Sequence, residues 1–125
     1  MRHRISGYRL NRNKATRNAL RRSLIISLFA NNRIKTTLAK ASAIRGDAEK
    51  LITLAKNSAT GTDIDKVNAR RLAVTKLANA EVVKKLFDEV APKFEKRNGG
   101  YTRMLKLGPR VGDAADMVLL ELVEE

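Results

Sequence analysis

The sequence contains no cysteine, no tryptophan and only one histidine, His3. Without cysteine the chain forms neither disulfides nor thiolate metal sites, as is usual in a reducing cytoplasm. A single histidine, far in sequence from any acid, is a poor metal ligand and a poor general base. The apolar runs, such as residues 24–30, are too short and too interrupted to span a bilayer. We therefore expect a cytoplasmic protein with no metal, no cofactor and no membrane partner.

The sequence also lacks a recognisable catalytic arrangement. A nucleophile needs a base within reach, yet most acids occupy expected amphipathic helices. The glycines at 99–100 and 108–112 lack the lysine and the strand-to-helix setting of a phosphate-binding loop, so we interpret both segments as turns. The sequence thus predicts no catalytic residue, no enzyme activity and no small-molecule substrate.

Positive charge, by contrast, is abundant and unevenly distributed. The 125 residues include 26 Lys or Arg and 13 Asp or Glu, a net charge of +13. Residues 1–46 hold 12 of the basic residues and no acid, whereas residues 47–95 hold 9 basic and 8 acidic residues. Five basic residues follow without an acid in 96–112, and five acids without a base in 113–125. A long segment of one sign repels itself unless a polyanion neutralises it, so we expect a nucleic-acid partner.

The basic segment begins with residues 1–13, which have four arginines and few apolar side chains. They lack the material for a core of their own, and we interpret them as a basic N-terminal arm. We expect residues 14–125 to form a single α+β domain. Tyr8 stands among the arginines of the arm, the aromatic-among-basic pattern of RNA binders. Two roles are equally open for this side chain: stacking on a base, or anchoring the arm to the core.

The first two expected helices follow the arm. Helix formers run from residue 14 to residue 30, with the charges in the first half. Lys14 and Arg17 then lie near the positive end of the helix dipole, a position that becomes favourable when a phosphate binds there. Residues 38–57 place their apolar side chains on one face, with Thr37 as the N-cap.

Gly46 interrupts the second helix and predicts a bend or a close approach by another segment. Residues 62–65 resemble a capping box and predict the start of a third helix, which carries the pair Arg70 and Arg71. Asn79 is the expected cap of a last helix, and Pro92 its expected end, because the residue before proline avoids the α region.

Two strands near the C-terminus are the expected centre of the fold. Residues 117–123 set three apolar side chains at period two, which makes one strand face that helices must cover. Residues 33–37 alternate well enough for a short strand beside it. Residues 101–107 mix Leu105 and Leu107 with basic residues, and predict a strand with one buried and one solvated side.

The connection between the last two strands, residues 108–116, is long for a hairpin and carries Arg110. Two interpretations of this connection remain open: a solvated loop, and a loop that contacts a partner. Together these elements predict an α+β fold, with about four helices packed on a small mixed sheet of three strands and a basic N-terminal arm.

Candidate RNA-binding residues are the basic side chains of the arm, the first helix, the short strand, the third helix and the C-terminal strand and loops, with His3 and Tyr8. Contacts from such residues to the nucleic-acid backbone are largely independent of sequence. They are Arg2, His3, Arg4, Tyr8, Arg9, Arg12, Lys14, Arg17, Arg21, Arg22, Arg33, Lys35, Arg70, Arg71, Arg97, Arg103, Lys106 and Arg110.

Several motifs carry a family resemblance over nearly the whole chain. They are MRHRISGYRLNRN at the start, RIKTTLAKA at 33–41, EKLITLAK at 49–56, NARR at 68–71 and GGYTRMLKLGPRVGDAADM at 99–117. In this order and spacing they resemble the bacterial large-subunit ribosomal protein L-seventeen family. The resemblance implies a helix-rich α+β protein held in large-subunit ribosomal RNA, beside neighbouring large-subunit ribosomal proteins near the nascent-chain exit. It implies no enzyme activity.

A different class of function is a free nucleoid or regulatory nucleic-acid-binding protein. Such a DNA reader should present a recognition helix after a short turn, often with a dimer seam. Here the charge lies instead in an arm, a helix end and loops, which favours the ribosomal interpretation. Sedimentation with large subunits after a high-salt wash discriminates between the two.

Overall fold

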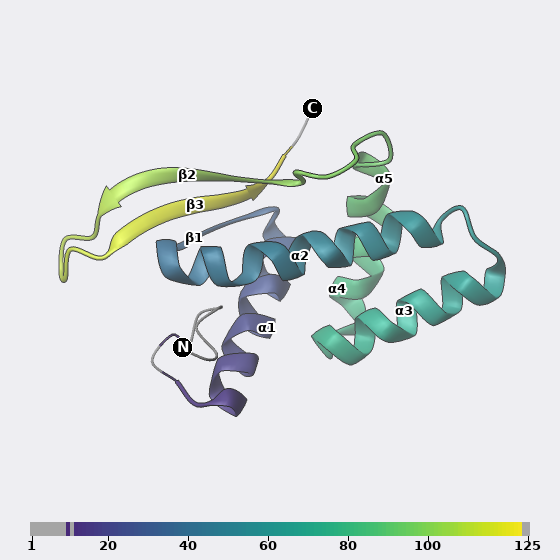
Figure 1. Cartoon of the computed structure of the whole chain (residues 1–125), viewed down its shortest axis with the longest axis horizontal. Helices are drawn as coiled ribbons and strands as arrows, with labels where there is room; N and C mark the ends of the chain where they lie inside the picture. Colours follow the sequence, from purple (N-terminus) through teal and green to yellow (C-terminus); the bar gives the residue numbers. More distant parts are fainter. Residues whose placement is uncertain (1–9, 11, 124–125) are drawn as a thin grey trace, which may run out of the picture.

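The computed structural model describes residue 10 and residues 12–123 (Figure 1). The elements are, in order, α1 (Lys14–Asn31), β1 (Arg33–Thr37), α2 (Leu38–Ser58), α3 (Asp63–Leu77), α4 (Ala80–Lys85), the π-helix η1 (Leu86–Val90), α5 (Ala91–Lys93), β2 (Thr102–Pro109) and β3 (Asp116–Leu122). The predicted α+β class is confirmed. The strand order is β1-β3-β2, and both pairings are antiparallel. The prediction of a mixed sheet is therefore wrong.

Side-chain caps begin the helices where the sequence predicts. The hydroxyl of Thr37 accepts a hydrogen bond from the Lys40 N–H, and the side chain of Asn79 accepts one from Val82. Both bonds of the capping box are present at the start of α3. Each of these side chains satisfies a backbone donor that the first turn leaves free, which sets the start of its helix.

The last helix does not end at Pro92, contrary to the prediction. It continues to Lys93, and Ala91 has φ −59° and ψ −41°. The preceding turn is π-helical, and the N–H of Ala91 donates to the carbonyl of Leu86, five residues back. Proline has no N–H to donate and its ring crowds the carbonyl four residues back, so a locally wider turn accommodates it without ending the helix.

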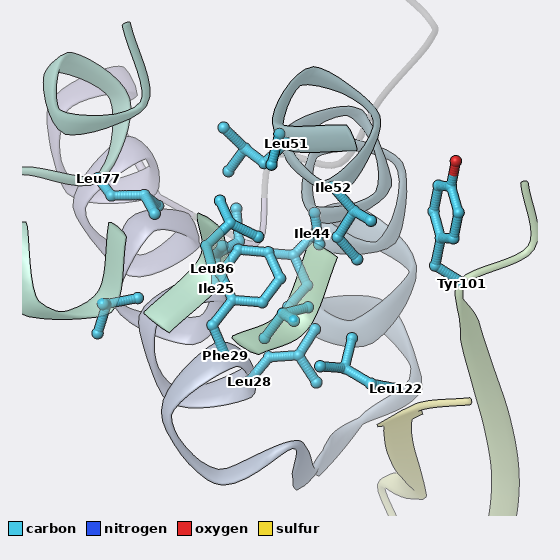
Figure 2. Close-up of a cluster of buried hydrophobic side chains, with 14 of the residues drawn as sticks. Ile25, Leu28, Phe29, Ile44, Leu51, Ile52, Leu77, Leu86, Tyr101 and Leu122 are labelled. Atoms are coloured by element: carbon cyan, nitrogen blue, oxygen red, sulfur yellow. The ribbon is translucent and has the colours of Figure 1, made fainter. Parts of the chain in front are cut away.

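One buried cluster joins the helices to the sheet, and Figure 2 shows its side chains. Leu28 and Phe29 of α1 and Ile44 of α2 are fully buried in it. From β3 come the three residues at period two, Val118, Leu120 and Leu122. Their burial confirms the predicted apolar face, and the helices lie on that side of the sheet (Figure 1).

Strand β2 lacks the continuous buried side that was predicted. Met104 pairs with Leu120 and is partly buried, whereas Leu105 pairs with Leu119 on the outer face and is 43% exposed. Leu107 is also exposed. The β2–β3 hairpin extends past the start of α2 (Figure 1), so its far half has no helical layer to pack against.

The connection between β2 and β3 is shorter than expected, because Gly108 and Pro109 pair with Met117 and Asp116 and only residues 110–115 form the turn. The register shifts between Lys106 and Gly108, which makes a β-bulge. Gly108 has φ +90°, a conformation that glycine adopts at little cost.

Of the two alternatives predicted at Gly46, a bend or a close approach, the close approach is wrong. A Cβ added at this glycine would meet no atom within 4 Å outside its own helix. The residue therefore leaves open space beside α2.

Candidate nucleic-acid interface

The first half of α1 presents cations without any acid. Asn13 caps the helix, and its side chain accepts a hydrogen bond of 2.9 Å from the N–H of Thr16. Lys14 is exposed, Arg17 is partly exposed, and the first turn contains no acidic residue. The free N–H groups and the positive end of the helix dipole therefore add to the side-chain charge, an arrangement suited to a phosphate.

Farther along α1, Arg21 and Arg22 border a cavity of about 290 Å³ between α1, α2 and α3. Four lining residues are cationic and only Asp47 is acidic. The lining consists of Asn18, Arg21, Arg22, Ile25, Asp47, Lys50, Leu51, Lys76 and Leu77. The structure thus concentrates positive charge around one concave surface.

The two arginines of this cavity are anchored by the neighbouring helices. A terminal nitrogen of Arg21 donates to the carbonyl of Ala43 at 2.9 Å and lies 3.0 Å from Oδ2 of Asp47. Nε of Arg22 donates to the carbonyl of Lys76 at 3.1 Å. Both guanidinium groups are therefore partly ordered before any ligand binds, which lowers the entropic cost of binding.

Lys50 and Lys76 line the same cavity but were not among the candidates from the sequence. Both belong to the charge-balanced segment 47–95, where nothing local distinguishes them from ordinary solvated lysines. Only the packing of α2 and α3 against α1 brings them beside Arg21 and Arg22.

A second group of candidates lies on the sheet. Arg33 and Arg103 occupy the two outer strands on either side of Glu121, in one row across the outer face. Nε of Arg103 donates to Oε1 of Glu121 at 2.7 Å. Lys35 is exposed and pairs with Leu119, and Lys106 is exposed and pairs with Val118.

Arg110 is paired within its own turn. Its Nε and a terminal nitrogen donate to the two carboxylate oxygens of Asp113, at 2.9 and 2.6 Å. The hydrogen bond from Arg110, with a further one from the N–H of Ala115, lowers the pKa of Asp113 to about 2. The guanidinium is therefore already engaged, and a phosphate would have to compete with this carboxylate.

The candidates on α3 differ from each other. Arg70 donates to Asp88 at 2.7 Å, and its guanidinium lies 4.9 Å from the ring centroid of Phe87. Arg71 is exposed.

Arg97 donates to the carbonyl of Gly100 at 3.4 Å, within the segment that leads into β2.

The structure does not bring all the candidates onto one surface. The first turns of α1 lie at the bottom of Figure 1 and the sheet lies at the top. Arg12, before α1, donates to the carbonyl of Leu10 at 2.6 Å. The remaining candidates of the arm lie outside the described residues; they are Arg2, His3, Arg4, Tyr8 and Arg9.

Across residues 10 and 12–123, no three His, Asp or Glu side chains are grouped to hold a metal ion. None of the helices in the same part of the chain is both long enough and apolar enough to cross a membrane.

Two kinds of comparison with known proteins, a family model and individual relatives, agree with each other. The family model described as Ribosomal protein L17 matches residues 20–123. The large ribosomal subunit protein bL17 of Solibacter usitatus (strain Ellin6076) is 48% identical over 123 residues, covering 98% of this chain and 77% of the relative. The protein of the same name from Alkaliphilus metalliredigens (strain QYMF) is 50% identical over 115 residues, covering 92% and 96% respectively.

Proposed function

Because the chain belongs to the ribosomal protein L17 family, we propose that it is a structural constituent of the bacterial large ribosomal subunit that binds ribosomal RNA. The arm (residues 1–13), the first half of α1 and the cavity beside Arg21 and Arg22 make the main contacts. The role is structural, in the cytoplasm, and includes no reaction, cofactor or small-molecule substrate.

The observation that carries this proposal is the acid-free cationic start of α1, continued by the anchored arginines of the cavity. Phosphates are the ligands that such a surface fits, because the N-terminus of a helix and a cluster of cations both favour negative charge. Contacts of this kind fix a protein on the nucleic-acid backbone and carry little sequence information.

In this proposal the other candidates contribute to RNA binding to different extents. Lys35 and Lys106 are exposed on the sheet, and we assign them peripheral phosphate contacts. Arg21 and Arg22 are also held by protein atoms, but they share the cavity with two further cations. Outside the cavity, arginines already held by protein atoms contribute less, because RNA must replace an existing interaction. These are Arg70, Arg97, Arg103 and Arg110, held by Asp88, Gly100, Glu121 and Asp113 respectively.

The finer placement near the nascent-chain exit, beside neighbouring large-subunit ribosomal proteins, is proposed from the family resemblance alone. So is the division of the chain into an arm and one α+β domain from residue 14. The relatives named above are both large-subunit proteins, which favours this role over a free nucleoid or regulatory protein.

The experiment measures the affinity of the purified protein for ribosomal RNA over a range of salt concentrations. Replacing Arg17 and Arg22 by Gln should reduce the slope of log affinity against log salt by roughly 0.7–0.9 for each phosphate that the variant no longer neutralises. The control variant replaces two exposed lysines, Lys84 and Lys93, by Gln and removes the same charge elsewhere. Equal slopes for the two variants would exclude α1 as the main RNA contact.

Sedimentation tests the ribosomal assignment itself. The tagged full chain should migrate with large subunits and stay there after a high-salt wash. Recovery as a free protein that binds duplex DNA would instead support the nucleoid alternative.

A further inference from the structure

Helix α3 exposes apolar residues on the side opposite its core contacts. It buries Ala69, Ala73 and Leu77, and yet Ile64 is 73% exposed and Val67 is 46% exposed. Val74 is also exposed. Large aliphatic side chains gathered on one helix face, away from the core, are a feature of surfaces that bind another protein.

These exposed residues have the spacing of a helix–helix seam. Ile64, Val67, Arg71 and Val74 follow intervals of three, four and three residues, so they lie along one stripe of the helix. We call these four residues the α3 seam. The pattern is that of the contact positions in a coiled coil, where two helices interlock side chains along such a stripe.

The charge within the seam is unmatched. The side chain of Arg71 makes no hydrogen bond or ion pair with the rest of the described chain, whereas its neighbour Arg70 is paired with Asp88. An arginine surrounded by aliphatic side chains is costly to bury unless a carboxylate faces it. A partner that covers the seam must therefore bring an acid opposite Arg71.

The same residues fit RNA poorly. Three of the four seam side chains are aliphatic, and the phosphates and sugars of an RNA backbone offer them little apolar surface in exchange for water. By contrast, a second amphipathic helix supplies aliphatic residues and an acid at the required spacing.

We propose that the α3 seam binds an amphipathic helix of another large-subunit protein, with aliphatic residues against Ile64, Val67 and Val74 and a carboxylate against Arg71. This inference rests on the proposed function, since the partner is encountered in the large subunit. It assigns α3 to protein contact and leaves the start of α1 to RNA.

The test places a benzophenone amino acid at Val67 of the full chain in bacteria and illuminates the purified large subunits. Mass spectrometry then identifies the adduct. Leu72 provides a matched control, because it is equally exposed on the same helix but lies about 140° around it from Val67. We expect the Val67 probe to join a helical protein segment bearing aliphatic residues and an acid, and the Leu72 probe not to join that segment.

Reversing the charge of Arg71 within the seam tests the proposal more specifically. Arg71→Glu should lower the yield of the Val67 adduct about tenfold, because it sets like charges against each other. Arg70→Gln, beside it but outside the seam, should leave that yield unchanged. An adduct with RNA alone, with a second copy of this chain or with nothing would overturn the inference.

A second measurement uses the absence of cysteine, since Val74→Cys introduces a single thiol. Maleimide should modify this thiol at least about tenfold more slowly in large subunits than in the free protein, whereas a thiol outside the seam, Lys84→Cys, should be slowed less. Equal protection of the two thiols, or none, would also overturn the proposal. Failure of the chain to sediment with large subunits would refute the proposed function, whereas normal sedimentation with an RNA adduct at Val67 would refute only the seam.

Discussion

Arg103 and Glu121 lie directly opposite each other on β2 and β3, and a terminal nitrogen of the arginine approaches Oε1 of the glutamate to 2.5 Å. The two side chains differ in environment: that of Arg103 is 53% exposed and that of Glu121 only 15% exposed. The arginine therefore neutralises a carboxylate that water reaches poorly.

The first prediction concerns this pair. Arg103→Gln should lower the free energy of unfolding by about 1 kcal/mol, because it leaves a largely buried carboxylate without its partner; fully buried pairs lose more and exposed ones less. Thermal or urea unfolding measures the loss. Adding Glu121→Gln to that variant should recover part of it, since the uncompensated charge is then gone. Additive effects in this double-mutant cycle would mean that the two residues do not interact.

The second prediction concerns Asp113, whose pKa of about 2 depends mainly on the hydrogen bond from Arg110. Arg110→Gln should raise this pKa toward its usual value, as an NMR titration of the side-chain carbonyl can show. Because the pKa is lower in the folded state, the stabilising contribution is present above the unfolded pKa, near 4. It is lost as the pH falls toward 2. An unchanged pKa in the variant would mean that the ion pair does not persist in solution.

The third prediction compares two leucines on opposite faces of the sheet. Leu120 is fully buried, and Leu120→Ala should lower the free energy of unfolding by roughly 2–5 kcal/mol. Leu105 lies on the outer face, and Leu105→Ala should change it by about 0.5 kcal/mol or less. Thermal unfolding of both variants provides the comparison, and similar losses would show that both faces of the sheet are covered.

Those two leucines also show what the sequence could predict. The period-two pattern of β3 was sufficient, because Val118, Leu120 and Leu122 all face the helices. In β2 the same kind of pattern misled, because pairing with Leu119 places Leu105 on the outer face, and the bulge before Gly108 shifts the register. Neither fact is local to the strand sequence.

The candidate site likewise combines features that the sequence predicts with features that depend on packing. The acid-free charge of residues 1–46 is enough to propose the start of α1 as a nucleic-acid contact, because that signal is contiguous in sequence. The contribution of Lys50 and Lys76 to the cavity arises only from helix packing. Likewise, the sequence indicates the charge of Arg70 but not its partner Asp88, which is 18 residues away and belongs to another helix.

The last prediction concerns the arm and follows from the charge of its sequence. Arg2, Arg4, Arg9 and Arg12 should each neutralise an RNA phosphate and release a counterion, so replacing all four by Gln should reduce the salt slope of binding by roughly 3. The effect should be similar for ribosomal RNAs of different sequence, because backbone contacts do not distinguish bases.

The matched control for the arm replaces four exposed lysines, Lys66, Lys84, Lys93 and Lys96, by Gln. Both variants have four fewer positive charges, so the long-range attraction falls by the same amount in each, and they differ only in the direct binding of phosphates. We therefore expect the slope to change much less in the control than in the arm variant. If both slopes fell equally, the arm would act only through net charge, and its assignment as a direct RNA contact would be wrong.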